Sequence, residues 1–261
     1  MTSAEDRPHH EIPHHARRAK SFGARASDYA AHRPDYPVDA VRWALEPVST
    51  GGPLRVLDLA AGTGKLTGVL CAEGHDVTAV EPDEAMLSEL VRLHRGVRAL
   101  PGRAERIPLP DGTMDAVVAG QAFHWFDPEL ALVEIARVLR PGGVVAGLWN
   151  GDDVDVEWVA GFSEVSGSRV STTLFETDHH LGTPHRLFTD DAEGVFGHSQ
   201  RRTAETLVAT ISTHSHVLVA PDEEREQLLS KMLSYLKSRP ETATGEFEMP
   251  MRTVVRRKVR R

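Results

Sequence analysis

The sequence predicts an α/β protein with a doubly wound, mostly parallel sheet and helices on both faces. Short apolar runs, of the length of buried parallel strands, alternate with helical periodicity between residues 54 and 150. The clearest unit is RVLDLAAGTGKLT, Arg55 to Thr67, in which an apolar strand passes through a glycine-rich turn into a helix. Near the end, Glu246 to Val255 alternates as an antiparallel strand does. We therefore expect seven strands, one of them antiparallel.

The composition limits the class of protein. The chain has 261 residues, 40% of them hydrophobic, enough for one ordinary globular domain with elaborations. No apolar run approaches the ~20 residues that span a bilayer, and the N-terminus lacks the apolar core of a secretory signal. The single cysteine, Cys71, excludes an intrachain disulfide, so we expect a cytoplasmic protein without a membrane partner. The net charge of -8 argues against a general nucleic-acid binder.

The first 20 residues form a polar head whose composition is typical of disorder. Histidines between residues 9 and 15 would place two pairs on one helical face. Pro8 and Pro13 break that helix, so a solvated tail is favoured over a metal site. Residues 21–47 follow, and Val38 to Pro47 reads as the helix before the first strand.

The glycine-rich turn indicates a nucleotide-binding corner. Gly62 and Gly64 allow a tight bend and the close approach of a ligand, and the helix that begins at Lys65 offers free N–H groups. The dinucleotide fingerprint G-x-G-x-x-G is incomplete, because Thr67 stands where the third glycine should be. An acid before the turn, Asp58, is also foreign to that fingerprint.

Two acidic residues suggest a different ligand. Asp58 can reach a positively charged amine, and Glu81, which ends the strand that begins at Asp76, can accept from both hydroxyls of a ribose. A ligand with a cationic amino-acid end and an adenosine end fits this pair. S-adenosyl-L-methionine is that ligand.

At these residues the chain resembles the class I S-adenosyl-L-methionine-dependent methyltransferases, and most closely their small-molecule branch, the type 11 methyltransferase domain. The resemblance rests on four motifs in order, VLDLAAGTGKLT, AVEPDEAM, GRAERIPLPDGTMDAVVAGQAFHWF and LRPGG. It covers roughly Phe22 to Asn150 well, and it implies a Rossmann-like fold with S-adenosyl-L-methionine as cofactor. The family usually has glycine at the position of Ala60.

The resemblance also implies a division of the chain. Beyond the head, residues 21–261 are expected to form a single methyltransferase domain. Its parts are an N-terminal lid and helix at 21–47, a cofactor-binding core at 54–150, a substrate-binding elaboration at 151–195, and C-terminal strands and helices at 196–261.

Further cofactor residues are carried over from the family pattern. Met86, in the helix after Glu81, falls near the cofactor there, although ordinary core packing is the favoured explanation for it. After a third strand, Val97 to Leu100, the resemblance places Ala104 and Glu105 at the edge of the adenine. The predicted cofactor-binding residues are Asp58, Ala60, Gly62, Gly64, Glu81, Pro82, Met86, Ala104, Glu105 and Gln121.

A fourth strand, Asp115 to Ala119, ends in an aromatic loop, and ligands of doubly wound sheets bind beyond the carboxyl ends of the strands. Aromatic faces there could shield the sulfonium and form the wall for the methyl acceptor. His124 could accept a proton at neutral pH, but we favour a structural or positioning role for it. In the family, a Tyr-bearing segment folds over the cofactor as a lid. The predicted catalytic residues are His124 and Trp125, and the predicted substrate or lid residues are Tyr29, Arg33, Tyr36, Phe123 and Phe126.

The rest of the chain is read from its periodicity. Asp127 is the expected N-cap of a helix with Pro128 in its first turn, running to about Leu139. The basic tail, residues 256–261, is expected to be a frayed, solvated end. The remaining predicted elements are strands at Val144–Trp149 and Val195–Thr203, and helices at Asp152–Gly167, Ala204–Ser212 and Asp222–Leu236.

The sequence thus predicts a methyltransferase that acts on a small-molecule acceptor, at oxygen or carbon rather than nitrogen. A motif of the Asn-Pro-Pro-Tyr type for amino acceptors is absent, and no cluster of acidic residues suggests a metal. A non-catalytic scaffold or sensor that binds S-adenosyl-L-methionine is the alternative. A nicotinamide-dependent oxidoreductase is disfavoured by the glycine spacing.

Overall fold

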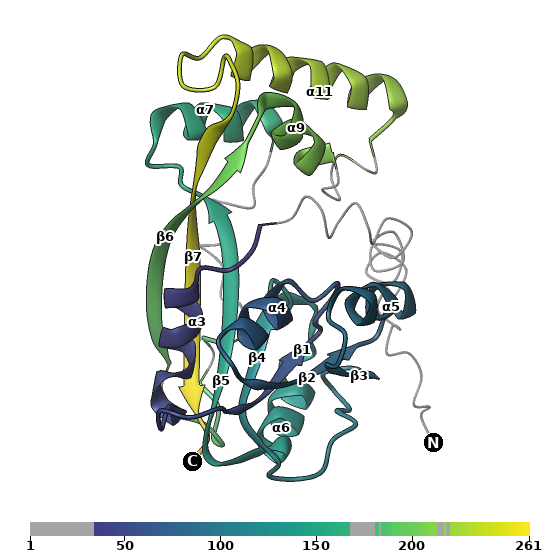
Figure 1. Cartoon of the computed structure of the whole chain (residues 1–261), viewed down its shortest axis with the longest axis vertical. Coiled ribbons are helices and arrows are strands. Elements are labelled where there is room, and N and C mark those ends of the chain that lie inside the picture. Colours follow the sequence, from purple (N-terminus) through teal and green to yellow (C-terminus); the bar gives the residue numbers. More distant parts are fainter. Residues whose placement is uncertain (1–33, 168–180, 183, 190, 213–216, 218–219) are drawn as a thin grey trace, which may run out of the picture.

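The fold is built on a seven-stranded mixed sheet with strand order β3-β2-β1-β4-β5-β7-β6 (Figure 1). The computed structural model describes residues 34–167, 181–182, 184–189, 191–212, 217 and 220–261. Strands β1 to β5 run parallel, and β7 pairs antiparallel with both β5 and β6, as the sequence predicts. The strands are β1 (Arg55–Leu59), β2 (Asp76–Glu81), β3 (Arg98–Pro101), β4 (Met114–Gly120), β5 (Leu139–Asp152), β6 (Ala192–Arg202) and β7 (Phe247–Val259).

Helices cover both faces of the sheet, because side chains of the central strands alternate between two apolar layers. Leu57 and Val117 point into a core that includes α6 (Pro128–Val138). Val56 and Val118 point to the opposite face, against α3 (Val38–Leu45) and α4 (Lys65–Ala72). A fourth helix, α5 (Glu84–Leu93), packs on β2 and β3.

The helix that follows the aromatic loop begins as predicted. The Asp127 carboxylate accepts hydrogen bonds from the backbone N–H groups of Glu129 and Leu130, each at 3.1 Å, and Pro128 occupies the first turn. An N-cap side chain of this kind satisfies donors that have no partner within the helix. The loop therefore leads into α6 at a defined position.

Strands β5, β6 and β7 continue beyond the parallel part of the sheet and carry a second group of helices (Figure 1). We call this group the cap lobe: α7 (Glu157–Ser166), α9 (Ala204–Ser212), α11 (Asp222–Lys237) and the adjoining ends of the three strands. It has its own apolar core, with Phe162 and Leu236 fully buried. β5 is longer than predicted and continues to Asp152 beside β7, which leads the chain into the cap lobe. β6 begins three residues before its predicted start and ends at Arg202. We call the rest of the sheet with its helices the sheet lobe.

The C-terminal tail is not a frayed, solvated end, so that prediction is wrong. β7 runs to Val259, so Arg256 and Arg257 pair with β5 on one side and with β6 on the other, and Lys258 pairs with β5. The Arg257 guanidinium lies over the ring of Trp43, 3.8 Å from its centroid, and pairs with Glu46 at 2.7 Å. Lys258 is only 1% exposed. Long basic side chains bury their aliphatic stems while the charge finds a partner, so a basic composition is compatible with an interior strand.

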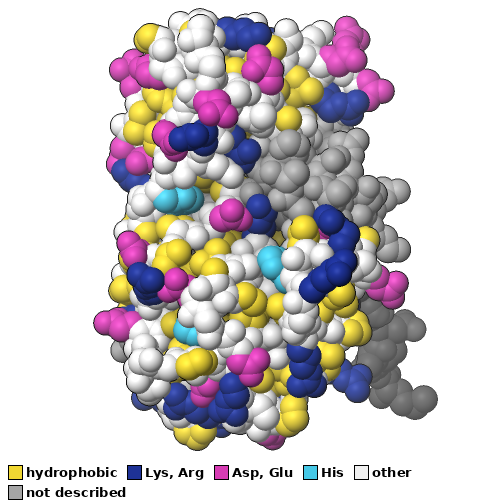
Figure 2. Space-filling model, in the orientation of Figure 1, with side chains coloured by type: hydrophobic (Ala, Val, Ile, Leu, Met, Phe, Trp, Pro, Cys, Tyr) yellow, Lys and Arg dark blue, Asp and Glu magenta, His cyan; other side chains and the backbone are white. Residues whose placement is uncertain are grey.

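The polar head and two predicted lid residues, Tyr29 and Arg33, lie outside the described residues. On the face shown in Figure 2, acidic and basic side chains are interspersed over both lobes. Within the described ranges, no helix is both long and apolar enough to cross a membrane.

Candidate functional site

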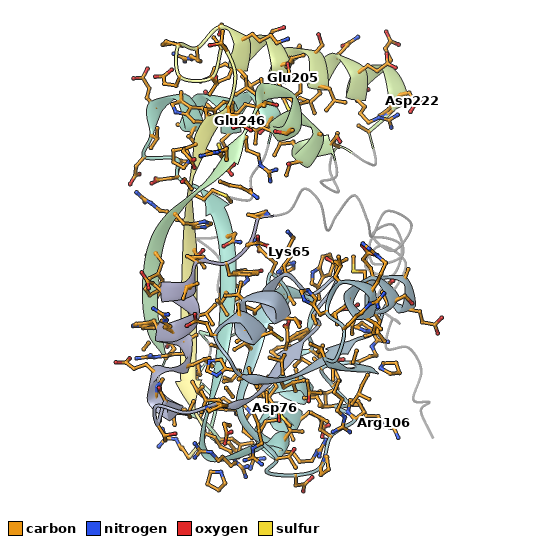
Figure 3. All side chains as sticks on the ribbon, viewed as in Figure 1. Lys65, Asp76, Arg106, Glu205, Asp222 and Glu246 are labelled. Atoms are coloured by element: carbon orange, nitrogen blue, oxygen red, sulfur yellow. The ribbon has the colours of Figure 1, made fainter. Side chains whose placement is uncertain are left out.

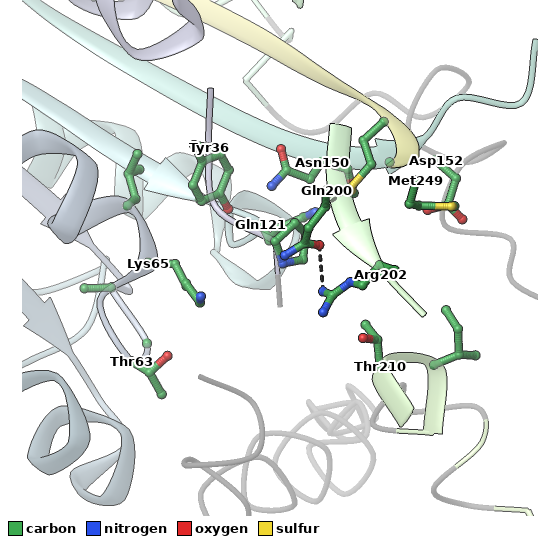
Figure 4. Close-up of a pocket in the computed structure, with 18 of the residues that line it drawn as sticks. Tyr36, Thr63, Lys65, Gln121, Asn150, Asp152, Gln200, Arg202, Thr210 and Met249 are labelled. Carbon is green, nitrogen blue, oxygen red and sulfur yellow. Dashed lines mark hydrogen bonds between the residues drawn. The ribbon is translucent and has the colours of Figure 1, made fainter. Parts of the chain in front are cut away.

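A cavity lies between the sheet lobe and the cap lobe, at the carboxyl ends of β1, β4 and β5 (Figure 4). This is where a doubly wound sheet binds ligands. The sheet lobe, the end of β5 and the segment before α3 contribute Pro34, Tyr36, Asp58, Ala60, Ala61, Gly62, Thr63, Lys65, Leu66, Gly120, Gln121, Asn150, Gly151 and Asp152. The cap lobe contributes Gln200, Arg202, Leu207, Thr210, Ile211, Met249 and Met251.

The glycine-rich loop after β1 has several residues in the left-handed region of backbone space. Gly62 has φ of 57° and Gly64 has φ of 88°, which glycine adopts without steric cost. Ala60 also has φ of 57°, and a left-handed alanine is strained by roughly 1–2 kcal/mol. A Cβ on Gly64 would lie 2.6 Å from Cδ2 of His94, so this glycine is required by packing as well.

Asp58 is the most unusual polar group of the cavity. It is 1% exposed, and its Oδ2 accepts from the Thr67 hydroxyl at 2.6 Å. Oδ1 has no hydrogen-bond partner among the described residues. Burial raises the pKa of Asp58 to about 7. The hydroxyl of Thr63, 2% exposed, also has no partner within the described part of the chain. Buried polar atoms without partners beside a cavity fit a ligand that supplies the missing hydrogen bonds.

Glu81 fastens the glycine-rich loop to the end of β2. Its Oε2 accepts from the backbone N–H of Gly62 and its Oε1 from that of Asp83, both at 2.9 Å. The residue is 5% exposed, and burial raises its pKa. Each carboxylate oxygen has a second lone pair, so these bonds leave room for the predicted ribose contacts. Glu81 is not among the described residues that line the cavity.

The other predicted adenine-side residues also lie outside that lining. Met86 is buried beneath the loop, with its sulfur 3.8 Å from where a Cβ on Gly62 would stand. Glu105 accepts from the backbone N–H of Asp127 at 3.1 Å, which ties it to the start of α6. Ala104 is buried and Pro82 is exposed. Their predicted cofactor contacts stay predictions.

Gln121 and Tyr36 do line the cavity, on the side where β4 ends. Gln121 has φ of 55°, and its side-chain amide donates to the carbonyl of Asn150 at 2.7 Å. Tyr36 is 8% exposed, and its hydroxyl would lie 2.4 Å from a Cβ on Gly120. Glycine at position 120 therefore allows the tyrosine to pack against the end of the strand.

The aromatic loop is divided between core and surface. Phe123 and Phe126 are buried core residues, with ring centroids 5.1 Å apart. The structure places them inside the sheet lobe rather than on the cavity wall, because the 3-10 turn at Phe123–Trp125 directs them under the sheet. The rings of His124 and Trp125 lie 4.8 Å apart, and both residues are exposed. None of the four is among the described lining residues.

Asn150 also lines the cavity and is not among the residues predicted from the sequence. Its Oδ1 accepts from the Thr253 hydroxyl at 2.6 Å, and its Nδ2 donates to the carbonyl of Asp35 at 3.2 Å. The same hydroxyl lies 3.0 Å from Nε2 of His198, which then acts as the donor. Asn150 thus connects β5, β7 and the segment before α3. A lone polar residue at the end of the apolar run in β5 was the available signal.

Two cations at the cavity were also not predicted. Lys65, at the start of α4, faces the cap lobe in Figure 3 and pairs with Asp35 at 3.0 Å. Arg202, at the end of β6, is 8% exposed and donates to the side-chain oxygen of Gln200 at 2.6 Å. Burial lowers the pKa of Arg202. No local motif marks these residues, since they meet only when the two lobes come together. Over the described ranges, no group of three or more His, Cys, Asp or Glu side chains could hold a metal ion.

Comparison with known proteins gives consistent matches. A family model described as a methyltransferase domain matches residues 57–147. An uncharacterized methyltransferase of Mycobacterium tuberculosis is 36% identical over 230 residues, which cover 86% of this chain and 89% of the relative. An uncharacterized methyltransferase of Schizosaccharomyces pombe is 32% identical over 226 residues, which cover 85% and 89% of the two chains.

A more distant relative and a solved structure complete the comparison. A malonyl-[acyl-carrier protein] O-methyltransferase of Methylococcus capsulatus is 40% identical over 101 residues, which cover 36% of each chain. The structure of a provisionally assigned type II methyltransferase from Anaeromyxobacter dehalogenans superimposes with a TM-score of 0.64 at 24% identity, over 87% of this chain and 97% of that one. The structural match shows the shared fold.

Proposed function

We propose that this chain, which belongs to the S-adenosyl-L-methionine-dependent methyltransferases, transfers a methyl group to a small-molecule acceptor, at oxygen or carbon rather than nitrogen. The observation that supports this best is the cavity itself. It joins the glycine-rich loop on one lobe to apolar and polar side chains of the cap lobe on the other, so a ligand on the loop would face a partly enclosed space.

The residues of the loop fit the cofactor. The ammonium of the methionine end would satisfy Oδ1 of Asp58, and the hydroxyl of Thr63 offers a further hydrogen bond. Gly62 lines the cavity and leaves the backbone there open to close approach, whereas Gly64 packs against His94. Glu81 is proposed to accept from the ribose hydroxyls while it holds the loop. The bound cofactor supplies a methyl group that is already activated by the sulfonium.

The chain's own contribution is then mainly positioning. Holding an acceptor about 3 Å from the methyl group supplies much of the rate of such a displacement. Gln121 and Asn150 are fixed by hydrogen bonds to their neighbours at the edge of the cavity, so their polar groups present a rigid surface. No histidine is among the described lining residues. An acceptor that is already deprotonated, or that loses its proton readily, suits this arrangement.

One named relative supports oxygen as the acceptor atom. The malonyl-[acyl-carrier protein] enzyme of Methylococcus capsulatus is an O-methyltransferase, and 36% of this chain aligns with it. That similarity supports the type of reaction and leaves the acceptor to experiment.

Incubation with S-adenosyl-L-methionine that carries a labelled methyl group tests the proposal. Acidic, phenolic and polyketide-like molecules, together with matched amines, are screened for label in the product. We expect label in oxygen or carbon products, and Asp58→Asn serves as the cofactor-binding control. Label in amine products only would contradict the proposal. Cofactor binding without turnover on any acceptor would favour the scaffold alternative.

A further inference from the structure

One face of α5 supports the glycine-rich loop. Met86, Leu90 and the following His94 are spaced four residues apart, so they lie in a row along that face. The sulfur of Met86 lies 3.8 Å from where a Cβ on Gly62 would stand, and Cγ of Leu90 lies 3.0 Å from the same position on Gly64. None of the three is among the described residues that line the cavity, so the row contacts the loop away from the cavity.

His94 ends this row with a ring that two glycines admit. A Cβ on Gly64 would lie 2.6 Å from Cδ2 of His94, and a Cβ on Gly68, one helical turn further along α4, would lie 2.9 Å from its Cε1. Real Cβ atoms do not make contacts this short. Glycine at both positions therefore leaves a slot at the start of α4, and the imidazole fills it.

The two ends of α5 hold the same loop. Where the helix ends, the backbone N–H of His94 donates to the carbonyl of Leu90 at 2.8 Å, which fixes the base of the ring. Where it begins, the cap residue Asp83 donates its backbone N–H to Glu81, and the other oxygen of Glu81 accepts from the N–H of Gly62. The conformation of the loop is thus coupled to α5 through both Glu81 and His94.

The imidazole of His94 is kept in its neutral form. Burial lowers the pKa of His94, and the charge of Lys65 acts in the same direction. A hydrogen bond with the backbone of Gly64 and the charge of Asp35 act in the opposite direction, and burial outweighs them. Since the ordinary pKa of histidine is near 6.5, the ring is uncharged at pH 7 and above. It therefore adds no charge beside Lys65, which lines the cavity (Figure 4).

We infer that His94 is a positioning residue of the cofactor site, which holds the glycine-rich loop in the conformation that binds S-adenosyl-L-methionine. This inference rests on the proposed function and adds a residue that does not line the cavity. A loop that is already ordered binds its ligand without first losing conformational freedom. Without the ring, the left-handed Gly64 would border an empty slot. If the loop then kept its binding conformation about one tenth of the time, the apparent affinity would fall about tenfold.

Calorimetry with S-adenosylhomocysteine, the demethylated cofactor, tests this role in the full chain. His94→Ala should weaken binding by about tenfold. His75→Ala is the matched control, because His75 is also half-buried but lies before β2, at the end of the sheet away from the cavity. Its affinity should stay within about twofold of that of the native protein. An unchanged affinity in His94→Ala, or equal losses in the two variants, would overturn the inference.

Gly68→Ala perturbs the same slot from α4 and completes a double-mutant cycle. Gly68 is not among the described lining residues, and its new methyl group would displace the ring of His94. We expect Gly68→Ala to weaken binding by about tenfold in the native background and by less than twofold in the His94→Ala background. Equal losses in both backgrounds, or no loss in the native one, would refute the role of His94. The native background decides the question by itself if His94→Ala does not fold.

Hydrogen exchange separates positioning from a merely structural role. The amides of Gly62 and Gly64 are bonded to Glu81 and to the carbonyl of Ala61, and both report on the order of the loop. Without ligand, these amides should exchange about tenfold faster in His94→Ala than in the native protein, while the amides of β4 keep their native rates. Saturating S-adenosylhomocysteine should restore the protection. A lower melting temperature with unchanged exchange in the loop would make His94 a structural residue only and overturn the inference.

The outcomes separate this inference from the proposed function. Failure of the native protein to bind S-adenosylhomocysteine counts against the proposed function, and exchange of the loop amides without ligand still tests whether His94 orders the loop. If the native protein binds and His94→Ala binds equally well, only the role of His94 is refuted.

Discussion

Replacing Asp58 by asparagine should stabilise the cofactor-free protein at neutral and alkaline pH while it weakens cofactor binding. The folded protein holds a buried carboxyl whose pKa is raised by burial from 3.8 to about 7. Because the folded state binds this proton more tightly than the unfolded state, its stability falls as pH rises from about 4 to about 7. Asparagine keeps an oxygen that can accept from Thr67 and carries no charge.

The size of the effect follows from the shift. A rise of about three pKa units corresponds to about 4 kcal/mol, an upper bound for the destabilisation by the ionised carboxylate. Between pH 5 and pH 8, the wild-type protein loses stability over the roughly two pH units from pH 5 to pH 7, where only the folded state still binds the proton. The free energy of unfolding of Asp58→Asn relative to wild type should therefore increase by about 2–3 kcal/mol from pH 5 to pH 8. Urea denaturation without cofactor at both pH values measures this difference.

Asp115 provides a control with the opposite sign. Burial acts to raise the pKa of Asp115, but hydrogen bonds from Arg55 and Arg140 outweigh burial and lower this pKa to about 2. Its contribution to stability is present above pH 3.8 and is lost only as pH falls toward 2. Asp115→Asn should therefore differ from wild type by the same amount at pH 5 and pH 8. If Asp58→Asn also shows a constant difference, the carboxyl of Asp58 is already ionised at pH 5 and the reasoning is refuted.

Cofactor binding should show the reverse dependence on pH. The ammonium requires an ionised Asp58, so binding in wild type must displace a proton below pH 7. Affinity should then fall about tenfold for each pH unit below 7. In Asp58→Asn it should be weak and nearly independent of pH over this range. Calorimetry with S-adenosylhomocysteine measures both proteins, and equal pH profiles would show that Asp58 does not contact the amine.

Three further predictions concern the loop and its neighbours. Ala60→Gly should raise the free energy of unfolding by about 0.5–1 kcal/mol, because glycine adopts the left-handed conformation of residue 60 without strain. Ala61→Gly is the control. A larger rise in the free energy of unfolding for Ala61→Gly than for Ala60→Gly, measured by urea denaturation, would contradict this. Glu81→Ala should weaken S-adenosylhomocysteine binding by on the order of 1.5–3 kcal/mol, since the loop loses the acceptor of the Gly62 N–H and the ribose loses its proposed one. Unchanged affinity in calorimetry would exclude Glu81 from both roles. His124→Gln should lower turnover by less than about tenfold, because His124 does not line the cavity, whereas a general base contributes ~10²–10⁴-fold. A loss of several hundredfold with intact cofactor affinity would identify His124 as the base.

Three of the predicted cofactor-binding residues, Asp58, Ala60 and Gly62, line the cavity and lie close together in the chain. With Gly64 they belong to one strand and turn, so local steric rules decide their geometry. The cap by Asp127 is local in the same way. Element order and the antiparallel last strand follow from the alternation of apolar residues, which is also a short-range property.

What only the tertiary structure decided are the contacts between residues far apart in the chain. The aromatic loop has the predicted composition, but the packing of Phe123 under the sheet and the exposure of Trp125 depend on the 3-10 turn and on Trp149. The basic tail reads as solvated until β5 and β6 pair with it on both sides. Arg202 and Asn150 carry no local motif. They come to line the cavity because the extended strands bring the cap lobe over the glycine-rich loop, and their hydrogen bonds to neighbouring residues then orient their polar groups.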